Sequence, residues 1–322
     1  CLLYTKTRES RCKMMVFMSN CDTVEYYYRL LGNFNISMMD SAQVKKRKKK
    51  KNRSINSSST VDEEEDPVDV EEPLIDCALY KLHGQISQLE RTQTYSCFQK
   101  AESAVLFCTD VAARGLDVPD VTLVVQYDPP EDPNDYVHRV GRTARAGANG
   151  ESILFLLPFE TEYLDSVLGE ISANFSIRQL SLINLLPKKL KLDALRLRKH
   201  QEHDEEDAFG LSSHHVQLDL ERCLLRRETE EAEKQSEELN ELARKGFVSS
   251  VRAYATHSID TRHIFQMRRL HLGHLAKSFA LRDTPSNLGK LLRDQIKKKN
   301  KRKTFFDKNA GFSGDSKTEK AR

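Results

Sequence analysis

The sequence predicts an α/β protein in which helices cover both faces of a parallel β-sheet. Through residues 1–170, short apolar runs that suit strands alternate with patterns that suit helices. Successive parallel strands need a crossover segment between them, usually a helix, so this alternation is typical of a parallel sheet. Beyond about residue 172 the strand patterns stop, and we expect a small helical region there.

Five strands and four helices are expected in the α/β region. Met14 to Met18 has the apolar character of a buried strand. Asp22 is suited to cap the helix that follows, because its carboxylate can accept hydrogen bonds from the first helical turn. The expected strands span residues 14–18, 78–82, 104–108, 121–127 and 152–157, and the expected helices span residues 23–31, 87–98, 134–145 and 159–170.

Residues 40–75 interrupt this alternation. Seven consecutive basic residues, Lys45 to Lys51, precede a stretch rich in Ser and Asn and then an acidic segment from Asp62 to Glu72. Such segments lack the apolar residues needed to bury a core. We therefore expect a disordered surface insertion within a domain that spans residues 1–172.

Three segments are expected after this domain. Residues 173–215 are highly charged and are predicted to form a linker. Residues 216–283 are predicted to form a helical extension, with a long polar helix over 216–245 and a more hydrophobic segment over 247–281. Residues 284–322 are predicted to form a basic, disordered tail.

Composition excludes several classes of protein. No apolar run approaches the roughly 20 residues that cross a bilayer, so no membrane association is expected. None of the seven cysteines belongs to a CxxC pair, which argues against a disulfide framework and a metal site and predicts a reduced, intracellular protein. Because the first residue is Cys1 rather than Met, we expect the chain to begin part-way through a longer product.

The segment from His138 to Arg145, which reads HRVGRTAR, carries the strongest chemical signal. Its three arginines, Arg139, Arg142 and Arg145, are spaced by three residues and would lie along one stripe of a helix. Like charges this close repel one another, so an anion is expected to hold them, and planar guanidinium groups suit phosphate oxygens. The alternative is an ordinary exposed basic helix.

A second signal, TDVAARGLD, spans Thr109 to Asp117 directly after an apolar strand. Ligands of parallel α/β sheets bind at the carboxyl ends of strands. Gly115 would let a ligand approach the backbone, while Asp110 and Asp117 can hold hydroxyl groups or orient arginines. The alternative is a strand-to-helix turn that happens to carry charges.

Together the two segments resemble motifs V and VI of the DEAD-box RNA helicases of superfamily 2. The sequence VFMS at 16–19 resembles motif IV of that family, and QLER at 88–91 resembles its QxxR element. The resemblance covers residues 11–170. It implies that this region is the C-terminal RecA-like lobe of a two-lobe ATP-dependent RNA helicase.

The resemblance also implies roles for individual residues around ATP. Arg142 and Arg145 would be catalytic and contact the γ-phosphate of ATP bound to the other lobe, one of them as an arginine finger. Asp117 would bind the ATP ribose. His138, Arg139 and Arg114 would act between the lobes.

The resemblance further implies an RNA surface formed by Thr109, Gly115, Gln88, Arg91 and Ser19. Contacts to phosphates fix position without reading bases, so recognition of RNA in this family is largely independent of sequence.

The segments 245–254 and 271–283 resemble the extension of a nucleolar group of DEAD-box proteins, the subfamily of DEAD-box polypeptide thirty-one. This implies work in assembly of the large ribosomal subunit, with precursor ribosomal RNA and preribosomal proteins as partners. The basic runs Lys45 to Lys51 and Lys297 to Lys303 are compatible with import into the nucleus or with phosphate contacts. Nuclear and nucleolar residence is therefore expected.

Several residues of the extension could form a further RNA-binding face: Tyr254, Arg252, His271, His274 and Lys277. For Tyr254, packing in a helical core with its hydroxyl at the rim is the favoured interpretation. The pair His271 and His274 has no nearby Cys or acidic partner in the sequence and is interpreted as structural rather than metal-binding.

The sequence contains no GxxxxGK[ST] phosphate loop, no Asp-Glu-Ala-Asp tetrad and no Ser-Ala-Thr motif. In the family these belong to the N-terminal lobe, which holds Mg²⁺ and most of ATP, so the chain alone is expected to be inactive. The favoured interpretation is that the chain supplies the second half of an active helicase. The alternative is a non-catalytic module that binds RNA or a protein partner.

Overall fold

The computed structural model describes the greater part of the α/β region and of the helical extension. The longer described stretches are residues 2–7, 12–32, 35–38, 70–73, 75–110, 121–143, 150–165 and 229–282, with shorter pieces at 169, 217–218, 220–222, 224–225, 287, 289–290 and 293. The predicted linker over 173–215 and the tail from 294 onward lie outside the described residues.

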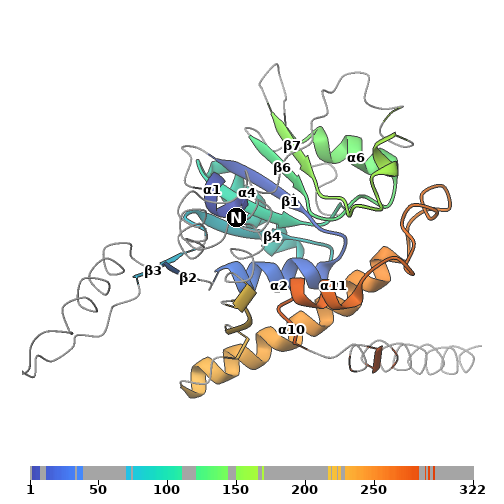
Figure 1. Cartoon of the computed structure of the whole chain (residues 1–322). Coiled ribbons are helices and arrows are strands. Elements are labelled where there is room, and N and C mark those ends of the chain that lie inside the picture. The colour runs from blue at the N-terminus through green and yellow to red at the C-terminus, as the bar shows by residue number, and fades with distance from the viewer. Residues whose placement is uncertain are drawn as a thin grey trace, which may run out of the picture.

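Five strands form one parallel sheet in the order β4-β5-β1-β6-β7 (Figure 1). The strands are β1 (Lys13–Phe17), β4 (Ala78–Leu82), β5 (Ala104–Cys108), β6 (Leu123–Gln126) and β7 (Glu151–Leu154). β1 lies at the centre, where Phe17 is in register with Cys108 of β5 and Gln126 of β6. The predicted parallel α/β sheet is confirmed.

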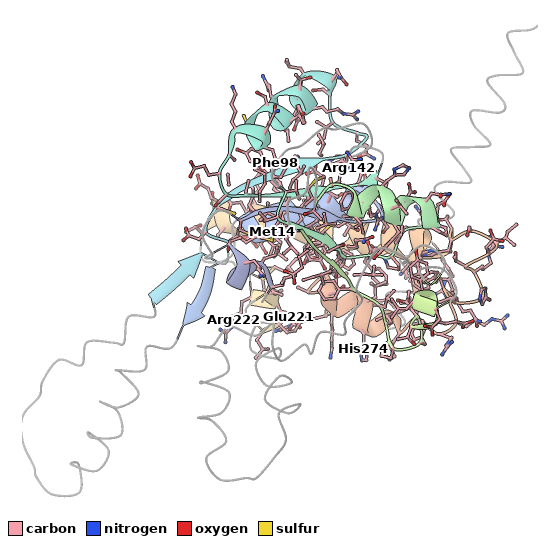
Figure 2. The ribbon with its side chains drawn as sticks, turned by 90° about the horizontal axis from the view of Figure 1, so that it is seen from above. Met14, Phe98, Arg142, Glu221, Arg222 and His274 are labelled. Carbon is pink, nitrogen blue, oxygen red and sulfur yellow. The ribbon has the colours of Figure 1, made fainter. Side chains whose placement is uncertain are left out.

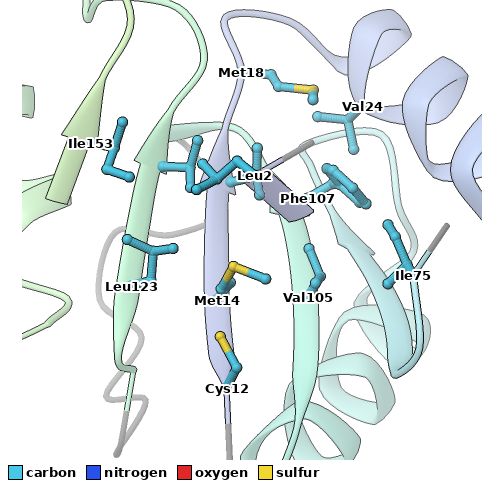
Figure 3. Close-up of a cluster of buried hydrophobic side chains, with 12 residues drawn as sticks. Leu2, Cys12, Met14, Met18, Val24, Ile75, Val105, Phe107, Leu123 and Ile153 are labelled. Atoms are coloured by element: carbon cyan, nitrogen blue, oxygen red, sulfur yellow. The ribbon is translucent and has the colours of Figure 1, made fainter. Parts of the chain in front are cut away.

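Helices cover the two faces of this sheet, and alternate residues of β1 explain how. Met14 and Val16 point to the face covered by α1 (Leu2–Lys6) and α2 (Cys21–Gly32), in a cluster with Val24 (Figure 3). Met15 and Phe17 point to the opposite face, where Phe98 of α4 (Gln88–Lys100) packs. Because both faces are covered, all five residues of β1 are buried, and the four that follow Lys13 form an uninterrupted apolar run.

The segment predicted as a disordered insertion over 40–75 is partly ordered at its end. Strands β2 (Asn35–Met38) and β3 (Val70–Pro73) pair antiparallel, and Ile75 is buried in the same cluster as Met14. Composition does not predict this pairing, because the hydrogen bonds that join the two strands come from the backbone and can form in an acidic sequence as well. The part of the insertion over 39–69 lies outside the described residues.

The extension contains α10 (Glu230–Tyr254) and α11 (Leu272–Ser278), and α10 packs along α2 (Figure 1). Phe247, Val251 and Phe279 meet Tyr26 and Leu30 of α2 in one buried cluster. The helix α2 is therefore enclosed between the sheet and the extension. No helix among the described residues is long and apolar enough to cross a membrane.

Candidate functional site

The loops that carry the predicted site residues leave the same edge of the sheet. Hydrogen bonds continue the strand pairing just past the strand ends: Met18 donates to the carbonyl of Cys108 at 2.9 Å, and Thr109 donates to that of Leu82 at 3.2 Å. This is the carboxyl edge, where ligands of parallel α/β sheets bind. The structure thus brings Ser19, after β1, and Thr109, after β5, to one edge.

Arg139 of α6 (Pro133–Val140) connects these strand ends. Its Nε and Nη2 atoms donate to Oδ1 and Oδ2 of Asp110 at 2.6 and 2.7 Å, and Nη1 donates to the carbonyl of Asp128 at 2.7 Å. The guanidinium also lies 5.3 Å from the ring centroid of Phe17. A two-pronged ion pair of this kind fixes orientation as well as distance.

The position of Arg139 differs from the interlobe role expected for it. Its side chain is only 1% exposed, and Asp110 and Asp128 take up its donors inside the lobe. The expected helical stripe does not continue from Arg139 to Arg142, because the helix ends at Val140. The backbone nitrogens of Arg142 and Thr143 donate to carbonyls three residues back in a turn. Arg139 and Arg142 therefore point to different surroundings.

His138 lies on the exposed side of α6, and Arg142 lies in the turn that follows the helix. The His138 side chain is exposed, Arg142 is partly exposed, and Nε of Arg142 donates to the carbonyl of His138 at 3.1 Å. Asp132 caps the start of the helix by accepting from the backbone of Asn134 at 2.8 Å. Figure 2 shows Arg142 on the side of α6, whereas His274 lies on the side of α11.

Four other expected site residues lie outside the described residues: Arg114, Gly115, Asp117 and Arg145.

The remaining residues of the expected RNA surface are all described. Gln88 is exposed in the first turn of α4, which Ser87 caps by accepting from the backbone of Glu90. Two buried polar atoms at this edge, Oγ1 of Thr109 and Nε of Arg91, have no hydrogen-bond partner among the described residues. Buried polar atoms are rarely left unpaired, so both could bond to a ligand at this edge.

Ser19 is held by a residue that the sequence did not suggest. Both its backbone nitrogen and its Oγ donate to Oδ2 of Asp128, each at 2.9 Å. Burial raises the pKa of the Asp128 carboxyl, and the two bonds from Ser19 only partly oppose that effect. Because the Asp128 carbonyl also accepts from Arg139, the loops after β1, β5 and β6 form one connected unit.

A second charged cluster on the same edge was also not predicted. Nζ of Lys81 donates to both carboxylate oxygens of Glu25 at 2.7 and 2.9 Å, and Nε2 of His83 lies 2.9 Å from Oε1. The hydrogen bond with His83 and the ion pair with Lys81 lower the pKa of Glu25 to about 2, against the effect of burial. Burial acts to lower the pKa of His83, but hydrogen bonds with Cys21 and Glu25 prevail and raise it to about 9.

The extension braces the loop that carries Ser19. Ser250 of α10 lies 3.0 Å from Oγ1 of Thr23 and 3.3 Å from Nδ2 of Asn20, the residue that caps α2. Ser249 donates to Asp22. The adjacent serines in an otherwise hydrophobic run are the sequence signal that could have found these contacts.

Tyr254 packs against residues of the lobe and of the extension, and the rings of His271 and His274 lie against each other. The Tyr254 hydroxyl donates to Oε1 of the buried Glu160 at 2.6 Å, while its ring packs edge-on against Phe265. The rings of His271 and His274 lie 4.0 Å apart. Within the described ranges, no group of three or more His, Cys, Asp or Glu residues could hold a metal ion.

Comparison with known families agrees with this arrangement. The model of the helicase conserved C-terminal domain matches residues 48–147, and the model of the C-terminal extension of ATP-dependent rRNA helicases like SPB4 matches residues 236–287. The chain carries a helicase C-terminal domain followed by a C-terminal extension like that of SPB4-like rRNA helicases. The sheet and extension described above are the structural counterparts of those two parts.

Curated relatives align with most of the chain. They include ATP-dependent RNA helicase dbp7 of Schizosaccharomyces pombe (45% identical, 65% of this chain, 28% of the relative). DEAD-box ATP-dependent RNA helicase 17 of Oryza sativa is 35% identical over 91% of this chain and 43% of its own. The human protein named ATP-dependent DNA helicase DDX31 is 34% identical over 92% of this chain and 31% of its own. The chain therefore spans less than half the length of these relatives.

A solved structure of Mss116p bound to single-stranded RNA and AMP-PNP shares the fold. Its TM-score is 0.50 at 23% identity, and the match covers 91% of this chain and 44% of that protein.

Proposed function

We propose that this chain supplies the second lobe of an ATP-dependent RNA helicase, which remodels RNA duplexes when an N-terminal lobe joins it. The observation that carries the proposal is the connected unit at the carboxyl edge of the sheet. Arg139 and Asp128 hold the loops of Ser19, Asp110 and Arg142 in a fixed relation. Such a unit can transmit the position of ATP phosphates to an RNA surface.

In this proposal Arg142 and Arg145 bind the γ-phosphate of ATP held by the N-terminal lobe, and Asp117 binds the ribose. His138 and Arg114 contact the other lobe, whereas Arg139 positions the loops from within. An arginine finger is worth about 10³–10⁵ in rate. Mg²⁺ would be held by residues of the N-terminal lobe.

RNA would cross the edge formed by Ser19, Thr109, Gly115, Gln88 and Arg91. Oγ1 of Thr109 and Nε of Arg91, which have no partner in the described part of the chain, are donors to which phosphate oxygens could bond. Contacts of this kind are insensitive to base sequence.

The cellular setting that we propose is assembly of the large ribosomal subunit in the nucleolus, with precursor ribosomal RNA and preribosomal proteins as partners. Support comes from the match of residues 236–287 to the extension of SPB4-like rRNA helicases and from the basic runs at 45–51 and 297–303.

The test is Arg142→Glu in a two-lobe protein made by joining this chain to the N-terminal lobe of the fission-yeast relative. RNA-stimulated ATP hydrolysis should fall by at least about 10³-fold, the lower value for a lost arginine finger. Binding of RNA without ATP should persist. Arg244→Glu, on the exposed surface of α10, is the matched control and should keep turnover. Turnover that survives Arg142→Glu would show that the finger assignment is wrong.

A further inference from the structure

A cavity of about 450 Å³ lies where the extension meets the lobe. Its walls come from the loops after β6 and β7 and from the ends of α10 and α11. His274, labelled in Figure 2, lies on the α11 side of it. The aromatic residues of the lining are Tyr127, Phe155, Phe159 and Tyr254. The volume is within the range of small-ligand pockets.

The cavity is continuous with the proposed path of RNA. Ser19 and Asp128, which are hydrogen-bonded to each other at 2.9 Å, both line it. A strand whose phosphates lie on Ser19 would therefore pass the opening, with its bases within reach of the aromatic walls.

The polar groups of the lining differ in whether they already form hydrogen bonds within the protein. The carboxylates already accept hydrogen bonds from the protein: Asp128 from Ser19, Glu160 from Tyr254, and Glu131 from Thr256 at 3.0 Å. By contrast Nδ1 of His257, one of the lining residues, is buried and has no hydrogen-bond partner within the described ranges.

His257 is held rigidly in the wall. The residue is 4% exposed, and its ring stacks on Phe265 with centroids 3.9 Å apart. Burial lowers the pKa of His257 to about 4, so the imidazole is neutral at physiological pH. A neutral ring nitrogen fixed in this way can form one hydrogen bond to a ligand.

The rim has the charge that a polyanion requires. Arg269 lies over the ring of Phe159, 4.8 Å from its centroid, and none of the ion pairs of the described residues involves it. His271 and His274 are exposed beside it. This places a cation at an opening whose walls are aromatic, a combination that suits a nucleotide with its phosphate outside and its base inside.

We propose that the cavity binds one unstacked base of the single-stranded RNA whose backbone lies on Ser19. The base would stack on the aromatic wall and bond to Nδ1 of His257, while Arg269 faces the adjoining phosphate. This inference rests on the proposed function, because it assumes that RNA crosses the carboxyl edge.

Two pairs of variants of the full chain test it. Ala253→Leu fills the cavity, whereas Ala255→Leu changes an exposed position two residues further on that is not in the lining. His257→Phe keeps the stacking but removes Nδ1, whereas His263→Phe changes an exposed histidine outside the lining. Urea unfolding verifies that each variant is folded.

The measurement is the Kd, by fluorescence anisotropy, for a short oligouridine and for an abasic ribose-phosphate strand of the same length. Ala253→Leu should weaken oligouridine binding about 10-fold, the typical loss of one stacked base. His257→Phe should weaken it less, the two controls should not change it, and neither cavity variant should affect the abasic strand. Cross-linking of 5-iodouridine RNA should label Tyr254 or Phe159.

The outcomes separate the two proposals. If the unchanged chain binds neither strand, the proposed RNA edge itself is wrong. If it binds both strands equally and Ala253→Leu has no effect, RNA binding stands and the base pocket is overturned. That second result is also the one expected if the cavity instead holds an apolar side chain of a protein partner.

Discussion

The guanidinium of Arg139 joins loops that are far apart in the sequence. It is bonded to Asp110 after β5 and to the backbone of Asp128 after β6, and Asp128 in turn holds Ser19 after β1. A charge this deeply buried costs free energy unless it is paired. The bonds among Arg139, Asp110 and Asp128 therefore stabilise the lobe only when all of them are formed.

Replacing Arg139 should destabilise the lobe markedly. Arg139→Ala leaves Asp110 without its partner, and breaking a buried pair costs about 3–5 kcal/mol. The lower end of this range applies, because the Asp110 side chain is 22% exposed. Urea unfolding measures the loss. Arg142→Ala, at a partly exposed position, should change the free energy of unfolding by no more than about 0.5 kcal/mol. Equal effects of the two changes would contradict the structural role of Arg139.

The cluster of Glu25, Lys81 and His83 predicts a pH dependence of stability. The pKa of Glu25 is lowered from 4.5 to about 2, so its contribution is complete above pH 4.5 and is lost as pH falls toward 2. The pKa of His83 is raised from 6.5 to about 9, so its contribution is complete below pH 6.5 and is lost as pH rises toward 9. The cluster should contribute most between these limits.

Unfolding free energies of the wild type and of Glu25→Gln, measured across this pH range, give the test. The difference between the two proteins should be largest near pH 5–6 and should shrink on both sides, since the variant removes the partner of both cations. A difference that is constant with pH would contradict the assignment.

At the residue scale, the sequence indicates which side chains belong to the candidate site, but it does not distinguish their individual roles. Arg139 and Arg142 have the same spacing pattern, but only burial separates the internal connector from the exposed candidate for ATP. Asp128 carried no signal because its role depends on a partner 109 residues away.

At the scale of elements, the contact between α10 and Phe279, the residue that follows α11, depends on a glycine. A Cβ added to Gly246 would lie 2.7 Å from Cε1 of Phe279, closer than such atoms approach, and the Phe279 ring is itself buried. The helix passes through Gly246 without a break because the missing side chain makes room for that ring.

Gly246→Ala should therefore destabilise the chain, although alanine favours an isolated helix by about 1 kcal/mol. Crowding of a packed core costs about 1–3 kcal/mol. Gly32→Ala at the end of α2 is the control, because its added Cβ would meet Leu79 at an ordinary 3.7 Å. Thermal unfolding of both variants decides the sign. Stabilisation by Gly246→Ala would show that the Phe279 ring does not pack this closely against α10.

The same glycine explains one error of sequence interpretation. The sequence suggested a polar helix over 216–245 and a separate segment from 247, whereas α10 runs from Glu230 to Tyr254. Glycine has a low helix propensity, so the sequence favours a helix end at this position and does not show which residue packs against it. By contrast the strands Ala78–Leu82 and Ala104–Cys108 have the expected bounds. For Ala104–Cys108 the reason is that an uninterrupted, fully buried apolar run has few alternatives in a sheet covered on both faces.

At the scale of the whole molecule, the extension and the lobe share one set of contacts. Tyr27 of α2 bonds at once to Tyr127 after β6, at 2.8 Å, and to the carbonyl of Ser278 in α11, at 2.9 Å. The extension therefore reaches the loop that carries Asp128 and, through it, Ser19. Sequence alone could not supply this, since each part has an apolar face and nothing local specifies which faces meet.

The most direct test of the account is strand separation by the two-lobe protein described above, measured on matched RNA and DNA duplexes with and without ATP. We predict ATP-dependent separation of the RNA duplex and loss of that activity in Arg142→Glu. Binding of RNA with no ATP turnover in the unchanged protein, beside an active fission-yeast relative, would contradict the account and favour a non-catalytic RNA-binding module.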